Sequence, residues 1–120
     1  MTARAALTTI EIIEDEGLVE NAARVGAFAL ARLQAMKDKH ALIGDVRGRG
    51  LLLGIELVTD RAEKTPASQE ADAVMYRALE RGLSFKTTFG NVLTLTPPLT
   101  VTETEMSRAL DIIDECIAAV

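Results

Sequence analysis

The segment from Leu51 to Val58 constrains the fold more than any other part of this sequence. Its residues follow a two-residue period, and successive side chains of a strand point to opposite faces of a sheet. One face carries Leu51, Leu53, Ile55 and Leu57, and the other carries Leu52, Gly54, Glu56 and Val58. Only Glu56 among these eight residues is charged, so the pattern predicts a central strand with most of both faces covered.

Two glycines stand just before this strand. Gly48 and Gly50 flank Arg49 and lack a Cβ atom, so both can adopt positive φ angles. We therefore expect Val46-Arg47 to fold back against the strand as a tight hairpin.

Apolar residues at helical spacing predict four helices in the rest of the chain. The first two span residues 3–16 and 18–39, with Gly17 between them as a helix stop. A third begins with Thr65 as N-cap and Pro66 as its first residue, and Gly82 ends it. A capping box at 102–105 opens the last one.

Short strands are expected over 83–85 and 92–96, with a loop over 86–91 that turns at Gly90-Asn91. Helices, a hairpin and short strands in this order predict an α+β fold. We expect a two-layer sandwich, in which a small antiparallel or mixed sheet is covered by helices mainly on one face. The length suits a single domain over residues 1–120.

Composition excludes several classes of partner. The net charge is −5 with no basic patch, which argues against nucleic acid and against an anionic membrane surface. No apolar run is long enough for a membrane span, and no signal peptide is visible. Cys116 is the only cysteine, so no internal disulfide can form, and a cytoplasmic location is expected. The positive mean hydropathy, +0.18, fits either a well-filled core or a face meant for another domain.

The sequence contains no recognisable catalytic set. It has no metal-ligand spacing, no nucleophile elbow and no phosphate-binding loop, so we assign no catalytic and no metal-binding residue. Arg47 and Arg49 are candidates to bind a carboxylate. The alternative is that one of them pairs with Asp45 or Glu56 while the other faces solvent. His40 stands at the C-terminal end of a helix, where a cation interacts favourably with the negative end of the helix dipole.

Four segments closely resemble the class III aminotransferases, which are pyridoxal-phosphate enzymes of fold type I. Val46 to Leu57 resembles their VRGxGLxxGIEL motif, and Thr96 to Val101 resembles APPLTV. Arg77 to Leu83 resembles the helix and glycine turn between these motifs, and Ala5 to Asn21 resembles the helices that leave the large domain. The four lie in register over nearly all 120 residues.

The resemblance implies that this chain is the C-terminal small domain of such an enzyme. In the family, the Schiff-base lysine and most phosphate contacts lie in the preceding large domain, so no residue here is expected to bind the cofactor. The implied substrates are a small-molecule amino donor and a keto acid, and the implied assembly is a homo-oligomer. The alternative is a stand-alone α+β interaction or regulatory domain, and a complete small enzyme is disfavoured.

One departure from the family affects substrate recognition. Many members carry an arginine three residues before the first proline of the APPLTV segment, where it pairs with the substrate carboxylate. Thr94 occupies that position here. A replacement cation is expected nearby, and we predict Lys86, helped by Thr87 and Thr88, with Arg47 as a further candidate; a solvated Lys86 is the alternative.

Overall fold

The computed structural model describes all 120 residues and contains four helices and five strands. In chain order these are α1 (Thr2–Asp15), α2 (Leu18–Lys39), β1 (Ile43–Arg49), β2 (Leu52–Asp60), β3 (Thr65–Pro66), α3 (Ser68–Glu80), β4 (Lys86–Thr88), β5 (Val92–Leu95) and α4 (Glu103–Ala118). The predicted α+β two-layer fold is confirmed.

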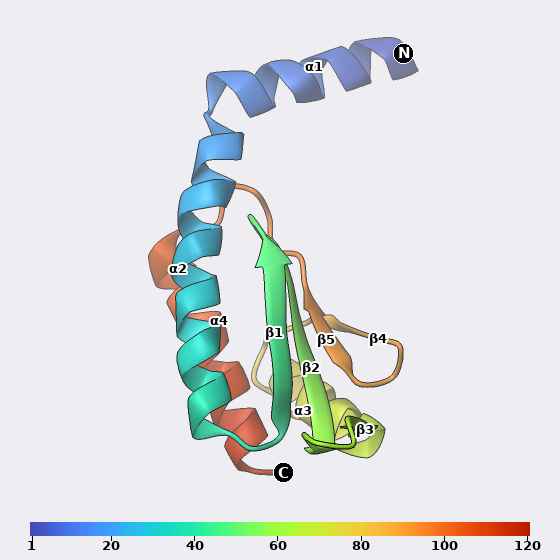
Figure 1. Ribbon diagram of the computed structural model, residues 1–120. Coiled ribbons are helices and arrows are strands. Elements are labelled where there is room, and N and C mark those ends of the chain that lie inside the picture. The colour runs from blue at the N-terminus through green and yellow to red at the C-terminus, as the bar shows by residue number, and fades with distance from the viewer.

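Four strands form the main sheet in the order β1-β2-β5-β4, and every pair is antiparallel. The β1–β2 hairpin turns at Gly50-Leu51, and Gly50 has a φ of +56°. Gly48 keeps a strand conformation opposite Leu53, so only one of the two glycines supplies the positive φ. α2 and α4 lie side by side against one face of this sheet (Figure 1).

The core lies between the sheet and these helices. Ile55, Leu57 and Leu93 are fully buried on the covered face of the sheet, and Leu33 and Leu110 meet them from α2 and α4. The Thr102–Glu105 capping box is present at the start of α4, as predicted. Cys116 is buried on α4, as the apolar pattern around it indicated.

The prediction that most of both faces of β2 is covered holds for the first face and is wrong for the second. β2 is central, because β1 and β5 flank it, but Leu52 on its second face is 61% exposed. Val58 is buried there, because a bulge at Gly44 of β1 lets that strand close against it. The remainder of this face, hereafter the open face, carries no helix.

Two predicted boundaries are also wrong. Thr65-Pro66 pairs with β2 as the short strand β3, and α3 starts only at Ser68. Proline has no N–H to donate, and it is tolerated in an edge strand because the ladder does not need a donor on the strand's outer side. The residues 83–85 are not a strand; the strand is Lys86–Thr88, which we had expected to be loop. Its pairing with β5 depends on a turn at Phe89-Gly90, one residue earlier than predicted.

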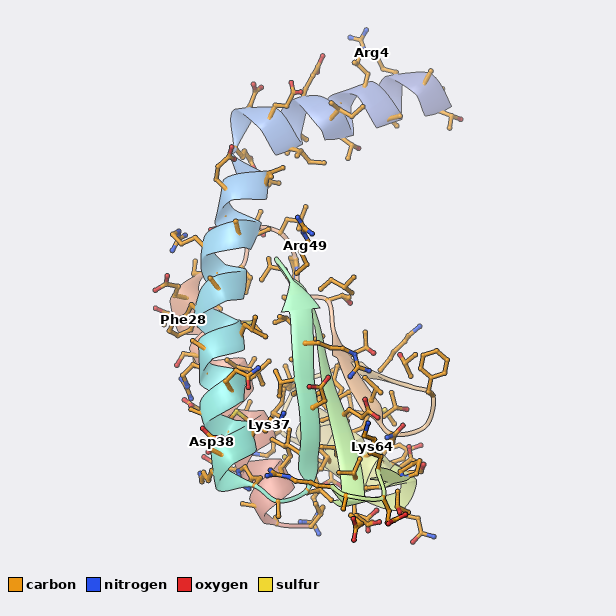
Figure 2. All side chains as sticks on the ribbon, viewed as in Figure 1. Arg4, Phe28, Lys37, Asp38, Arg49 and Lys64 are labelled. Atoms are coloured by element: carbon orange, nitrogen blue, oxygen red, sulfur yellow. The ribbon has the colours of Figure 1, made fainter.

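α1 stands apart from the rest of the fold. It projects from the N-terminal end of α2 at a sharp angle, and none of its residues is buried (Figure 1). Gly17, with a φ of +60°, makes the bend. Leu7 and Ile10 are each more than half exposed, while Arg4 points away from the body of the molecule (Figure 2).

Candidate functional site

The open face brings together residues from four strands. Because facing residues of paired strands share a face, Arg47, Gly54, Thr94 and Lys86 form one row across it. The row spans three strand spacings, roughly 14 Å, which is enough for a small molecule. Three of the predicted substrate-binding residues therefore share a face: Lys86, Thr94 and Arg47.

Thr88 joins this group, and Thr87 does not. Thr88 faces Val92 on the open side, and its Oγ1 lies 2.7 Å from Oγ1 of Thr94 in a hydroxyl–hydroxyl hydrogen bond. Thr87 pairs with the buried Leu93 and so points toward the helices. The alternation of a strand separates them, whereas the loop predicted here would have left both available.

Arg47 is held by two carboxylates. Its Nη1 donates to Oδ2 of Asp45 at 2.8 Å and to Oε2 of Glu56 at 2.7 Å. Hydrogen bonds to Glu56 and then to Asp45 raise the pKa of Arg47. The hydrogen bond from Arg47 in turn lowers the pKa of Asp45. Its charge is therefore matched within the sheet, as the ion-pair alternative predicted.

Arg49 is exposed at the end of β1 near the hairpin tip and forms no ion pair (Figure 2). Lys86 is likewise exposed and unpaired on β4. Both are therefore free cations of the open face. The sequence identified Arg49 and Lys86 as candidates. It could not show whether Arg47 or Arg49 pairs with Glu56, because the register of β1 against β2 decides this.

A hollow of about 350 Å³ lies between the hairpin tip and β5 on this face. Gly54 forms part of its floor, where the absence of a side chain leaves the space open. Thr88 and Thr94 line it with hydroxyl groups, Leu52 and Phe89 with hydrocarbon, and Arg47 and Arg49 with charge. Lys86 is not one of its lining residues but lies beside Thr94 on the neighbouring strand. Such a lining suits a small ligand with both a polar and an apolar part.

Phe89 was missed at the sequence level. It has a φ of +53° and its side chain is 91% exposed. The signal was the Phe-Gly-Asn run, in which an aromatic residue stands at a turn position that usually holds asparagine, aspartate or glycine.

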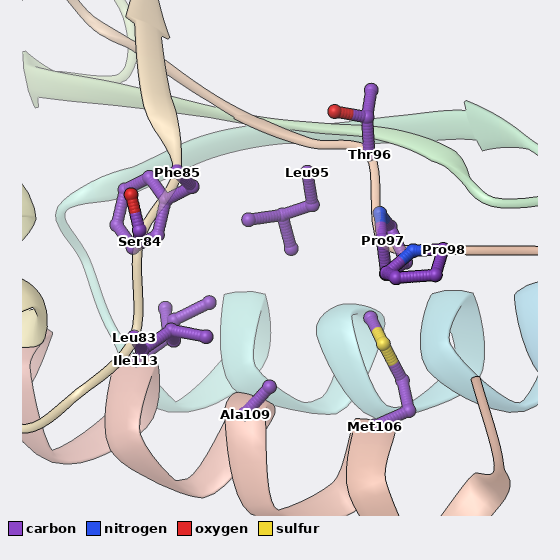
Figure 3. Close-up of a pocket in the computed structure, with 10 residues that line it drawn as sticks. All are labelled: Leu83, Ser84, Phe85, Leu95, Thr96, Pro97, Pro98, Met106, Ala109 and Ile113. Carbon is purple, nitrogen blue, oxygen red and sulfur yellow. The ribbon is translucent and has the colours of Figure 1, made fainter.

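A second cavity, of about 230 Å³, lies on the helical side between α4 and the segment 83–85. Figure 3 shows Leu83, Phe85, Leu95, Met106 and Ile113 around it. No charged residue lines it, and Ser84 and Thr96 carry its only side-chain hydroxyls. It offers no acid or base, and therefore nothing that would activate either hydroxyl as a nucleophile.

His40 is a structural residue, as predicted for a helix end. It follows α2, and its Nε2 lies 2.5 Å from Oδ1 of Asp114 on α4. Burial opposes ionisation of Asp114, but hydrogen bonds from Lys39 and His40 outweigh it and lower the pKa of Asp114. The cluster ties the end of α2 to α4, far from the open face.

Comparison with known proteins settles the family. The sequence model described as "Aminotransferase class-III" matches residues 1–117. The chain belongs to the class III aminotransferase family. It is 48% identical over 116 residues to the (R)-1-hydroxy-2-aminoethylphosphonate ammonia-lyase of Vibrio splendidus. This alignment covers 97% of this chain and 24% of that protein.

Other members of the family match similarly. The leucine/methionine racemase of Thermococcus litoralis is 44% identical, over 100% of this chain and 27% of its own length. A Bacillus anthracis aminotransferase structure superposes with a TM-score of 0.89 at 37% identity, covering 96% of this chain and 27% of that one. The chain thus spans about a quarter of these class III relatives. No helix in it combines the length and apolar character needed to cross a membrane.

The residues present do not form a pyridoxal phosphate site. The four lysines of the chain are Lys37, Lys39, Lys64 and Lys86. Lys39 is 60% exposed and bonded to Asp114, Lys37 lies 3.8 Å from Asp45, and the other two are exposed. No lysine is enclosed, as a Schiff-base lysine needs to be to lose its proton.

Proposed function

We propose that residues 1–120 are the C-terminal small domain of a pyridoxal-phosphate-dependent class III enzyme, and that the open face of the sheet binds its substrate. The reaction we propose is transfer of an amino group between an amine or amino acid and a keto acid. The observation that carries the proposal is the row of Arg47, Gly54, Thr94 and Lys86 across a face that no helix covers. A relative at 42% identity, the hypotaurine/taurine–pyruvate aminotransferase of Paracoccus denitrificans, supports the reaction class.

The exposed helix α1 supports the placement within a longer enzyme. Its side opposite Arg4 carries Ala6, Ile10 and Ile13, none of which is buried against this chain. An amphipathic helix without a covered apolar stripe is unstable in water. We propose that this stripe docks on the large domain, which also supplies the contacts of a homo-oligomer in the cytoplasm.

The cofactor is assigned to that large domain, since no lysine here fits it. When bound, pyridoxal phosphate supplies an electron sink for the substrate carbon that carries the amine. This chain contributes hydrogen bonds and charge. Thr88 and Thr94 share a hydrogen bond, so one of their two hydroxyl protons stays free to donate to a substrate oxygen. Lys86, beside Thr94 on the next strand, neutralises an anionic group of the substrate.

Replacement of Lys86 by methionine in the intact enzyme tests this role. An anionic substrate left unpaired in a closed site loses binding energy. For an anionic amine, kcat/KM should therefore fall by a factor equivalent to about 2–4 kcal/mol of transition-state stabilisation, and for a matched neutral amine it should fall little. Arg108→Met, which removes an exposed cation without an ion pair from α4 on the helical side, is the control. Equal losses for both amines, or none, would remove Lys86 from the site.

The 120-residue chain by itself should form no stable lysine adduct with pyridoxal phosphate. Borohydride reduction of the mixture followed by peptide mapping measures this. Stoichiometric labelling of one lysine would mean that the chain carries its own cofactor site.

A further inference from the structure

Phe89 occupies an unfavourable conformation that the fold of this chain does not explain. A residue with a Cβ atom costs roughly 1–2 kcal/mol in the left-handed region, and bulky residues are rare there. Burial could offset this cost, but the side chain is 91% exposed and contributes nothing to the core. Outliers of this kind cluster at functional sites.

The turn that carries Phe89 is anchored at its base. Asn91 is 5% exposed, and its Nδ2 donates to the Leu57 carbonyl at 2.9 Å. The Asn91 carbonyl accepts the Leu57 N–H at 2.8 Å, so the turn is tied to β2 by two hydrogen bonds. Gly90 lies close to Ser68 at the start of α3, and a Cβ atom there would stand 3.2 Å from the Ser68 hydroxyl oxygen. The backbone that carries the aromatic ring is thus held in a fixed position.

The hollow of the open face is the place where the ring can act. Phe89, Leu52 and Val92 supply its hydrocarbon lining, and Thr88 and Thr94 supply its hydroxyls. We propose that Phe89 is a specificity-determining residue, whose ring forms an apolar wall against the hydrocarbon part of a small anionic substrate. This inference rests on the proposed function, because it takes the open face as the substrate side. In this arrangement, Phe89 contacts the hydrocarbon part of the substrate and Lys86 contacts its anionic group.

The two roles predict different patterns in one binding experiment. The probes are straight-chain carboxylates from propionate to hexanoate, and their dissociation constants for the intact enzyme are measured by calorimetry. Each methylene buried against the ring should tighten binding by about fourfold, which corresponds to 0.8 kcal/mol. In Phe89→Asn this factor should fall toward one, while propionate binding stays nearly unchanged. Phe89→Leu, which stays apolar, should keep most of it.

Lys86→Met provides the arm that tests the proposed function separately. It should weaken every carboxylate by the same factor and leave the gain per methylene intact. If Lys86→Met has this effect and Phe89→Asn leaves the gain per methylene unchanged, the proposed role of Phe89 is wrong, while the assignment of the open face to substrate binding is supported. If wild-type enzyme binds none of the carboxylates, both proposals fail.

The thermal midpoint of Phe89→Asn gives a readout besides binding. Asparagine adopts positive φ more readily than phenylalanine, so the midpoint should be unchanged or higher. A lower midpoint, or equal weakening of all carboxylates, would mean that Phe89 packs against another part of the enzyme. Either result would overturn its role as a substrate wall.

Discussion

The two faces of the sheet differ in what holds their residues in place. On the covered face, Ile55 and Leu93 are fully buried and packed by two helices. On the open face, Leu52 is mostly exposed, Gly54 leaves a hollow, and Arg47 is matched by carboxylates of its own sheet. This chain packs one face completely and leaves the other largely uncovered.

The largest expected difference between the faces is in stability. Ile55→Ala removes a fully buried side chain and should lower the free energy of unfolding by about 2–5 kcal/mol. Leu52→Ala, three residues earlier and on the open face, should change it by no more than about 0.5 kcal/mol. Urea unfolding of the two variants measures the contrast. Equal losses would mean that the open face is packed in the folded chain.

A glycine on each side sharpens the comparison. Gly26 of α2 packs against the β1–β2 turn, and a Cβ atom there would overlap the Gly50 carbonyl oxygen. Gly26→Ala should therefore cost about 1–3 kcal/mol, although alanine favours the helix. At Gly54 a Cβ atom would stand 3.5 Å from Cγ1 of Val92, an ordinary contact, so Gly54→Ala should leave stability nearly unchanged. A neutral Gly26→Ala would contradict the close approach of α2 to the hairpin.

A smaller effect is expected from pH at the helical layer. The pKa of Asp114 lies below its ordinary value of 3.8, so its ionised form stabilises the fold above that pH. This contribution is lost as pH falls through the lowered pKa. Asp114→Asn should thus cost about 1 kcal/mol at neutral pH and progressively less below pH 4.

Asp38→Asn, on an exposed residue without an ion pair, is the control and should show no such convergence with the wild type. A constant cost of Asp114→Asn at all pH values would exclude ionisation as its cause.

Sequence patterns predicted the covered layer more fully than the open one. The alternation from Leu51 to Val58 and the helix stripes depend on local periodicity, and they identified the hairpin, α2, α4 and the core. The placement of Lys86 and Thr87 depends on where the β4–β5 turn falls. The turn lies one residue earlier than predicted. As a result, the expected loop is a strand, and Thr87 lies on the face opposite to Lys86.

The pairing of Arg47 and the strain at Phe89 lay beyond local patterns. Whether Arg47 or Arg49 meets Glu56 follows from the register of β1 against β2. The turn that carries Phe89 is tied through Asn91 to Leu57, which lies 34 residues away, so no local pattern announces its conformation. The family resemblance pointed to Thr94 as a departure, and cross-strand pairing then put Lys86 beside it.

The most direct test of the substrate-facing open face is thiol alkylation in the intact enzyme. Thr94→Cys creates a reactive thiol on that face, while Cys116 is buried and should stay unlabelled. Ala35→Cys, exposed on α2, is the matched control. We predict that saturating pyruvate or L-alanine slows alkylation at position 94 at least tenfold and leaves position 35 unchanged, with labels located by mass spectrometry of peptides. Equal rates at position 94 with and without these ligands would contradict the assignment.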